Sequence, residues 1–171
     1  MGPKVFPGRY TAEIDGDFVV FLIGMRFNRF RDVKRWWPVF TAMPKMLRWL
    51  ESRPEAGLLG TRQAISGKTL LLVQIWRTFE DLDRFARDGD APHLEPWREF
   101  NRAVRDSGAV GIWHETYRVR AGEYETVYGN MPRVGLAAAG EHVPVGSTAR
   151  RQTAATRIGA REEDTPPVEG Y

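Results

Sequence analysis

The hydrophobic positions of the chain fall into short runs that predict alternating strands and helices. Residues 18–28, FVVFLIGMRFN, form a largely apolar run rich in β-branched and aromatic side chains, which indicates a strand covered on both faces. Residues 58–66 and 69–78 predict two further strands, and the two residues between them indicate a hairpin. A fourth strand is predicted over residues 110–119, VGIWHETYRV.

Helical spacing of apolar positions connects these strands. Residues 31–53 carry apolar side chains at intervals of three and four, which predicts a helix. Pro38 and Pro44 lie within it, and each removes an amide donor, so we expect the helix to be kinked or divided there. Residues 79–90 and 93–107 predict a pair of shorter helices before the fourth strand.

The two ends of the chain lack this patterning. Residues 1–17 are rich in proline, glycine and charge and are expected to form an irregular lead-in. Residues 146–171 contain almost no large apolar side chain, which is typical of a disordered or loosely held tail.

The order of the elements predicts an α+β domain over residues 1–145. Strand, helix, strand, strand, helix pair, strand is the ferredoxin-like βαββαβ order, in which helices cover one face of a four-stranded antiparallel sheet. The first and third strands are apolar on both faces, so the second face of the sheet must also be covered. A second copy of the chain is the economical partner, and a dimeric α+β barrel is therefore expected. The alternative is a larger sheet within one chain, but the sequence predicts too few further strands to form it.

Composition excludes several classes of site. The chain has 171 residues with no cysteine, so disulfides, iron–sulfur clusters and cysteine catalysis are excluded. Its three histidines lack zinc-site spacing, and no phosphate-binding glycine motif is present. The net charge of +3 is small, and the longest apolar stretch is too short to span a bilayer. We therefore expect a cytoplasmic protein without nucleic acid or membrane partners. The basic and aromatic segment RFNRFRDVKRWW could attract anions or nucleic acid, but we expect it to be a solvated helix start.

His114, in the fourth strand, is the main candidate for chemistry. Strand alternation places it on one face with Val110, Ile112 and Thr116, whereas Glu115 lies on the other face. A catalytic pair of these two neighbours is therefore not expected. Three roles stay open for His114: a buried neutral histidine of the core, a base in an apolar pocket, or the axial ligand of a haem iron, its only metal-binding role.

Further residues are expected around a pocket between helices and sheet. His93 begins a predicted helix and either makes local hydrogen bonds there or lies at the pocket mouth as a second catalytic residue. Arg26 and Gln74 could orient carbonyl or hydroxyl groups of a ligand if their sheet face is the pocket face. His142 is expected to be solvated. The aromatic residues expected either to line the pocket or to pack in the core are Trp36, Trp37, Phe40, Trp76, Trp97 and Phe100.

Three segments of the sequence resemble a known family. The blocks VGIWHETY, AGEYETVYGNMP and VGLAAAG are similar to those of monooxygenase-like proteins of bacteria and fungi, of the fumagillin-pathway oxygenase type, with the likeness covering roughly residues 15–145. The resemblance implies a dimeric α+β barrel. It also implies membership of a superfamily in which some proteins oxidise aromatic molecules without metal or flavin and others bind haem.

Three functions follow as hypotheses. The first is a monooxygenase-like oxidoreductase that acts on a small apolar, aromatic or polyketide-like molecule and requires no cofactor. The second is an enzyme with haem b ligated by His114, of the aldoxime dehydratase or chlorite dismutase type. The third is a protein that binds a small ligand without catalysis.

Overall fold

The chain forms two compact units. The computed structural model describes residues 2–89, 98, 108–146 and 151–159. One unit comprises Val19–Tyr117, and the other comprises Met1–Phe18 together with Arg118–Tyr171. We call them the four-stranded unit and the three-stranded unit after their sheets, and we describe each by itself.

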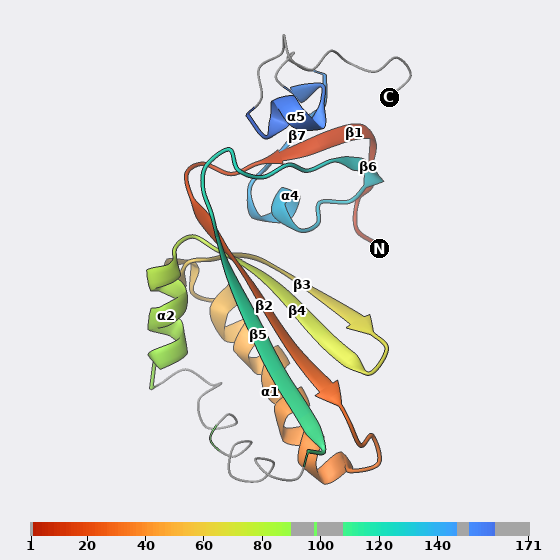
Figure 1. Cartoon of the computed structure of the whole chain (residues 1–171), viewed down its shortest axis with the longest axis vertical. Helices are drawn as coiled ribbons and strands as arrows, with labels where there is room; N and C mark the ends of the chain where they lie inside the picture. Colours follow the sequence, from red (N-terminus) through yellow and green to blue (C-terminus); the bar gives the residue numbers. More distant parts are fainter. Residues whose placement is uncertain (1, 90–97, 99–107, 147–150, 160–171) are drawn as a thin grey trace. The chain divides into compact units, whose positions relative to one another are not determined.

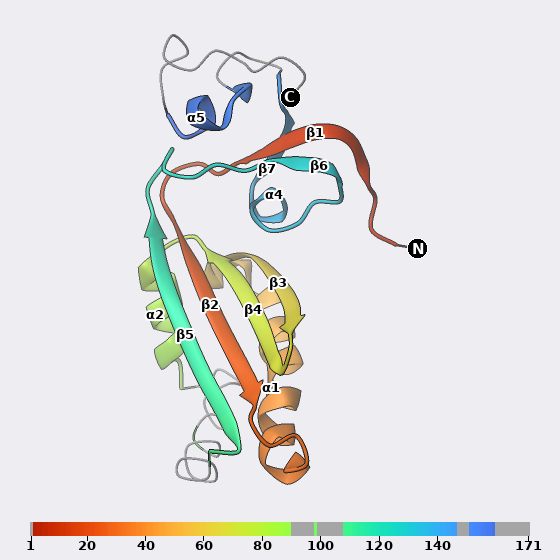
Figure 2. The same ribbon diagram turned by 45° about the vertical axis from the view of Figure 1, so that its right-hand side comes forward.

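The four-stranded unit has helices on one face of an antiparallel sheet. Its strands are β2 (Phe18–Phe27), β3 (Leu58–Ser66), β4 (Thr69–Trp76) and β5 (Val110–Val119), in the order β3-β4-β2-β5. Helices α1 (Val33–Glu51) and α2 (Phe79–Arg87) lie on the same face of this sheet, and the short turn η1 (Pro54–Ala56) precedes β3 (Figures 1 and 2). The predicted α+β class, four strands and hairpin are confirmed.

The core of this unit lies between the sheet and its helices. Strand register pairs Val19 with Trp76 and Ile23 with Leu72, so these side chains share the face that α1 covers. Trp76 is fully buried, and Leu50 of α1 packs into the same cluster. The apolar stripe of α1 is thereby removed from water, which is the main force that holds a helix to a sheet.

Helix α1 is not divided at its prolines, which was one of the two outcomes expected there. It runs as one helix from Val33 to Glu51 with Pro38 and Pro44 inside it. Its buried residues Met46 and Leu47 follow the second proline and pack on the sheet. Burial of this stripe outweighs the two missing amide donors, because most helix stability in proteins comes from tertiary packing.

Helix α2 is anchored at its first turn by Asp81. The Thr78 side chain caps the helix by accepting a hydrogen bond from the Asp81 amide at 3.0 Å. The buried Asp81 carboxylate accepts hydrogen bonds from Arg77 at 2.9 Å and Arg84 at 3.0 Å. Burial raises the pKa of Asp81, but the hydrogen bond and charge of Arg77 outweigh burial and lower it. Glycine is required at position 57, next to the Asp81 side chain. Its φ is 90°, and a Cβ at this position would lie 2.4 Å from an Asp81 carboxylate oxygen.

The three-stranded unit was not anticipated from the pattern. Its strands β1 (Phe6–Glu13), β6 (Tyr128–Met131) and β7 (Glu141–Pro144) have the order β6-β1-β7, and β1 pairs antiparallel with both neighbours. The short helix α4 (Leu136–Ala139) precedes β7. The expectation of an irregular lead-in over residues 1–17 is wrong, because β1 forms by pairing with segments more than 100 residues away in sequence.

Part of the expected tail is ordered by ion pairs. Helix α5 (Ala154–Arg157) lies within it. Arg151 binds the Glu13 carboxylate through two nitrogens, at 2.6 and 2.9 Å, and the nearly buried Arg157 binds Glu125. Over residues 151–159 the structure thus differs from the expectation of a disordered tail, because charge pairing takes the place of apolar burial there.

His142 is enclosed by aromatic rings, contrary to the expectation that it is solvated. Its ring stacks on Tyr10 at 4.3 Å and lies edge-on to Phe6 and Tyr128, at 5.0 and 5.8 Å. Both ring nitrogens are buried, with no hydrogen-bond partner in the described part of the chain. Burial, and then the charge of Arg133, lower its pKa.

We expect the three-stranded unit to lose stability in mild acid. Because the pKa of His142 is lower in the folded than in the unfolded chain, the unfolded chain binds the extra proton first. The contribution of the neutral ring is complete above the ordinary histidine pKa of 6.5 and decreases as the pH falls below it. Hydrogen exchange at β1 and β7 should therefore show roughly several-fold lower protection at pH 5.5 than at pH 7.5 after correction for intrinsic rates. His142→Phe should flatten this dependence; an unchanged slope would rule out His142 as its source.

Candidate functional site

A cavity lies between the helices and the sheet of the four-stranded unit. Its volume is about 420 Å³, which is large enough for a small organic molecule. Strands β2, β4 and β5 form its floor, and α1 and α2 form its walls. Most of the lining is apolar: Phe21, Ile23, Met25, Val39, Ala42, Met43, Met46, Phe79, Leu82, Phe85, Ala86 and Ile112.

Polar groups reach this cavity from opposite sides of Phe21. Gln74 of β4 pairs in register with Phe21 of β2, and His114 of β5 contacts the same ring, with centroids 5.7 Å apart. Because β2 lies between β4 and β5, the backbones of Gln74 and His114 are two strand spacings apart, about 10 Å. An apolar molecule bound between them would therefore have one polar protein side chain near each of its ends.

Gln74 is oriented by its neighbour in the core. The residue is 1% exposed, and its Oε1 accepts a hydrogen bond from the Trp76 indole nitrogen at 3.0 Å. The amide NH₂ group has no protein acceptor in the described part of the chain. Gln74 is therefore a fixed donor for a carbonyl or oxyanion of a bound molecule.

His114 lines the cavity as strand alternation predicts. Ile112 and Thr116 line it with His114, whereas the Glu115 carboxylate accepts a hydrogen bond from the Tyr117 hydroxyl at 2.7 Å. That hydrogen bond, and then the carboxylate charge, raise the pKa of Tyr117. No hydrogen bond or ion pair joins His114 to the described residues, and its side chain is exposed rather than buried in the core. Its ring nitrogens are thus available to a ligand.

The structure separates the other predicted pocket residues. Trp36, Trp37 and Phe40 line a different hollow, at the start of α1. Trp76 is core, and it acts on the cavity only through Gln74. Arg26 is exposed and alternates with Met25, so it lies on the sheet face away from the cavity. His93, Trp97 and Phe100 lie outside the described residues.

Some lining residues were not identified from the sequence. Met43 and Met46 of α1 and Leu82 and Phe85 of α2 complete the apolar walls, and Thr116 adds a hydroxyl beside His114. Helical spacing placed Met43, Leu82 and Phe85, but not Met46, on predicted apolar stripes. That signal cannot distinguish side chains that meet the sheet from side chains that border a space above it.

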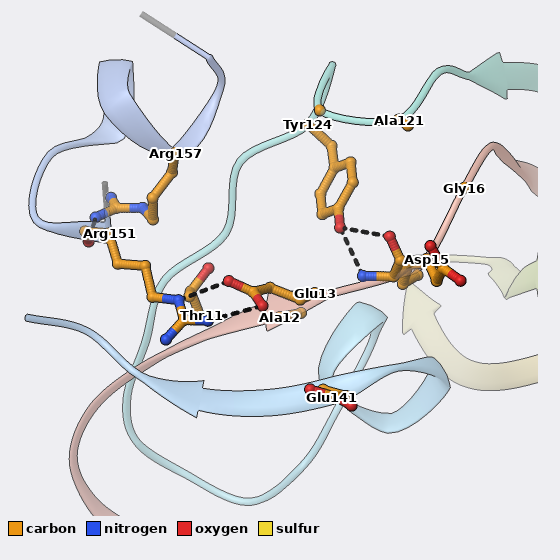
Figure 3. Close-up of a pocket in the computed structure, with 12 residues that line it drawn as sticks. Thr11, Ala12, Glu13, Asp15, Gly16, Ala121, Tyr124, Glu141, Arg151 and Arg157 are labelled. Carbon is orange, nitrogen blue, oxygen red and sulfur yellow. Dashed lines mark hydrogen bonds and ion pairs between the residues drawn. The ribbon is translucent and has the colours of Figure 1, made fainter. Parts of the chain in front are cut away.

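The three-stranded unit has a polar pocket of about 680 Å³ (Figure 3). Its arginines are paired: Arg151 points at Glu13 (Figure 3), and Arg157 binds Glu125. The Tyr124 hydroxyl contacts the backbone N and O of Ile14, at 2.6 and 3.3 Å (Figure 3). Although it is larger, this pocket has no histidine, and the groups it leaves to a ligand are mainly the carboxylates of Asp15 and Glu141, which have no ion pair among the described residues. We therefore take the apolar cavity as the candidate site.

The described residues define an α+β protein with a ligand-sized apolar cavity. Among them, no group of three or more acidic or histidine side chains is placed to hold a metal ion, and no helix is long and apolar enough to cross a membrane. The chain belongs to the monooxygenase af470-like family, whose model matches residues 18–136. This span contains every described residue of the cavity.

Individual relatives are distant. The chain is 29% identical over 151 residues to monooxygenase af470 of Aspergillus fumigatus, an alignment that covers 74% of this chain and 52% of the relative. The chain therefore spans about half the length of that protein.

Similar solved structures include proteins of two bacteria. A Bacteroides thetaiotaomicron protein described as a possible oxidoreductase is 12% identical, with a TM-score of 0.40, covering 60% of this chain and 97% of that one. A Shewanella oneidensis protein is also 12% identical, with a TM-score of 0.38, covering 75% and 100%. Likenesses at this level support no conclusion about function.

Proposed function

We propose that the chain is a monooxygenase-like oxidoreductase that binds a small apolar, aromatic or polyketide-like molecule in the cavity of the four-stranded unit. The observation that carries the proposal is the composition of the cavity. An apolar space of about 420 Å³ is bordered by the His114 imidazole, which has no hydrogen-bond partner among the described residues, and by the Gln74 amide donor. Thr116 and Asp83 also border it, and the Asp83 carboxylate is paired with Arg87 at 2.9 Å. Membership of a family named for a monooxygenase supports the same reaction class.

The residues suggest how oxidation proceeds without a cofactor. The imidazole of His114 accepts a proton from an acidic C–H or phenolic O–H of the substrate. The Gln74 amide donates a hydrogen bond to the oxygen on which the negative charge develops. The electron-rich anion then reacts with dioxygen: a CH₂ group becomes a carbonyl that keeps one oxygen atom, and the other oxygen leaves as water with the two hydrogens. The substrate supplies all four electrons.

The alternative role of His114, haem ligation, fits the observed contacts less well. A histidine that binds a metal is usually oriented by a hydrogen bond from its second ring nitrogen. No described residue accepts one from His114. Within the described residues, the surroundings of His114 therefore fit an axial ligand less well than a pocket base, and no step of the proposal passes through haem.

The proposal is tested by aerobic oxidation of an aromatic substrate panel. Phenols and anthrone-like ketones are incubated with the purified chain, and oxygen consumption and ¹⁸O incorporation from ¹⁸O₂ are measured. One labelled oxygen per product molecule supports the proposal. Binding of these molecules without oxygen uptake would favour a non-catalytic binding protein, and a Soret band lost in His114→Ala would establish haem ligation instead.

We also propose that the outer face of the four-stranded sheet is covered by a second copy of the chain. Leu22 and Val73 are partly exposed and paired in register at the centre of this face, and Leu71, also partly exposed, lies two residues before Val73 on the same face. These side chains are apolar, and the face lies away from both helices. A two-fold packing of equal faces would bury them.

Leu22→Arg is expected to convert a homodimer to a monomer. A guanidinium at the centre of an apolar sheet-to-sheet contact loses its hydration without gaining a partner, which weakens association by about 100-fold or more. Sedimentation equilibrium measures the change, and Val127→Arg, at a half-exposed site in the three-stranded unit, is the matched control. A wild-type chain that is monomeric at high micromolar concentration would contradict the dimer.

A further inference from the structure

Aromatic side chains gather at one end of the four-stranded unit and remain exposed. The end of β2, the start of α1 and the β3–β4 turn meet there (Figures 1 and 2). Phe30 is 64% exposed, Trp37 is 52% exposed and Ile65 is 81% exposed. Together with Val33 and Phe40 they form what we call the exposed aromatic patch.

Ring contacts make this patch continuous and ordered. Phe30 stacks on Trp36 at 5.6 Å, and Trp37 stacks on Phe40 at 5.9 Å. Trp36 joins the two pairs, with centroids 5.8 Å from Trp37 and 6.0 Å from Phe40. Its indole N–H also donates to the Phe30 carbonyl at 2.9 Å, which fixes the loop that carries Phe30. The large exposed rings are therefore held in place rather than scattered over the surface.

Cationic side chains surround the same end. Residues 26–37 hold five basic residues and one acidic residue, net +4, against +3 for the whole chain. Lys68, in the β3–β4 turn, lines the hollow beside the rings. Arg29, Arg31, Lys34 and Arg35 are exposed, and none forms an ion pair within the described part of the chain. The small overall charge thus conceals a strongly basic region.

We propose that this end of the four-stranded unit docks on an anionic lipid surface. Exposed aromatic and aliphatic side chains enter the boundary between headgroups and acyl chains, where an indole ring is especially favourable. The surrounding cations are attracted to acidic headgroups. The apolar patch thus matches the acyl-chain boundary of the membrane, and the basic residues around it match the acidic headgroups. The net charge of the sequence led us to expect no membrane partner.

The hollow beside the patch does not depend on the oxygenase proposal. It is lined by Phe27, Trp36, Phe40 and Leu70, among others, and shares no lining residue with the candidate active-site cavity. Met25 and Val39, which line that cavity, are close to these residues in sequence. Docking would nevertheless bring that cavity near a lipid phase in which an apolar substrate dissolves. Vesicle binding and oxygen consumption are measured separately, so either proposal can fail alone.

The test is sedimentation of the full chain with lipid vesicles. Neutral phosphatidylcholine vesicles are compared with vesicles that also contain about 30% phosphatidylglycerol, at low and high salt. We expect binding to the anionic vesicles at least about ten-fold stronger than to neutral ones, and weaker at high salt because the charges are exposed. Equal binding to both compositions, or none to either, would overturn the proposal.

Two variants separate charge from apolar insertion. Lys34→Gln with Arg35→Gln should weaken binding to anionic vesicles about 20- to 30-fold, since each cation near the surface contributes about five-fold. Trp37→Ser should weaken it about ten-fold through lost apolar contact. Val127→Ser with Arg120→Gln, exposed positions of the three-stranded unit, is the matched control and should bind as wild type. Patch variants that bind as wild type would contradict the proposal.

A spectroscopic measurement covers the case in which Trp37→Ser alters the fold. Brominated lipids should quench tryptophan fluorescence in the wild type, and Trp37→Phe should retain binding but lose the part of that quenching that comes from Trp37, leaving the part from Trp36, whose ring is 5.8 Å away. Quenching that is unchanged in Trp37→Phe would overturn the proposed orientation. If the chain does not bind vesicles but binds a single-stranded oligonucleotide tightly, the partner of this patch is nucleic acid instead of a lipid surface. If it does not bind vesicles but self-associates, and Trp37→Ser abolishes the self-association, the partner is a second copy of the chain.

Discussion

Replacing His114 with alanine is expected to lower kcat for substrate oxidation by about 10²- to 10⁴-fold, the usual contribution of a general base. The imidazole borders the cavity with no hydrogen-bond partner among the described residues, so its removal deletes the proposed proton acceptor and leaves the apolar walls in place. Substrate affinity should change little, since those walls supply most of the binding. Steady-state oxygen consumption, together with substrate binding measured without oxygen, separates the two effects.

Two controls test whether the loss reflects proton transfer. His114→Gln keeps a polar group of similar size but no base, and it should be as inactive as His114→Ala. Substrate that is supplied already deprotonated, at higher pH, should restore part of the rate in both variants. Full activity of His114→Ala would show that the base lies elsewhere and would leave His114 as a lining residue.

Replacing Trp76 with alanine is expected to cost about 3–5 kcal/mol of stability. Trp76 is fully buried among Leu72, Leu50 and Phe85, so its truncation leaves a large cavity in the core. It also removes the donor that holds the Gln74 side chain. Urea unfolding followed by circular dichroism measures the change, which should lower the midpoint without altering its slope.

Matched tryptophan variants distinguish core from surface. Trp37→Ser should lower stability by less than about 1 kcal/mol, because that ring is half exposed. Trp76→Phe should retain the fold but free the Gln74 amide to rotate, which would weaken substrate binding more than it affects unfolding. Similar destabilisation by Trp37→Ser and Trp76→Ala would contradict the burial of Trp76 on which this distinction rests.

The sequence by itself determined the four-stranded unit and the direction of His114. Period-two and period-3.6 patterns record which residues meet a core, and they located β2, α1, β3, β4, α2 and β5 within a few residues. Alternation along β5 likewise separated His114 from Glu115. These are local properties, because each depends only on the geometry of one strand or helix.

Only the tertiary structure decided which aromatic residues border the cavity and how the ends of the chain fold. Trp36 and Trp76 have the same apolar character in sequence, but one lies beside a surface hollow and the other in the core. Strand β1 exists because β6 and β7 pair with it, and residues 151–159 are ordered by the bond from Arg151 to Glu13. Such contacts join positions more than 100 residues apart, and no local pattern of hydrophobicity specifies them.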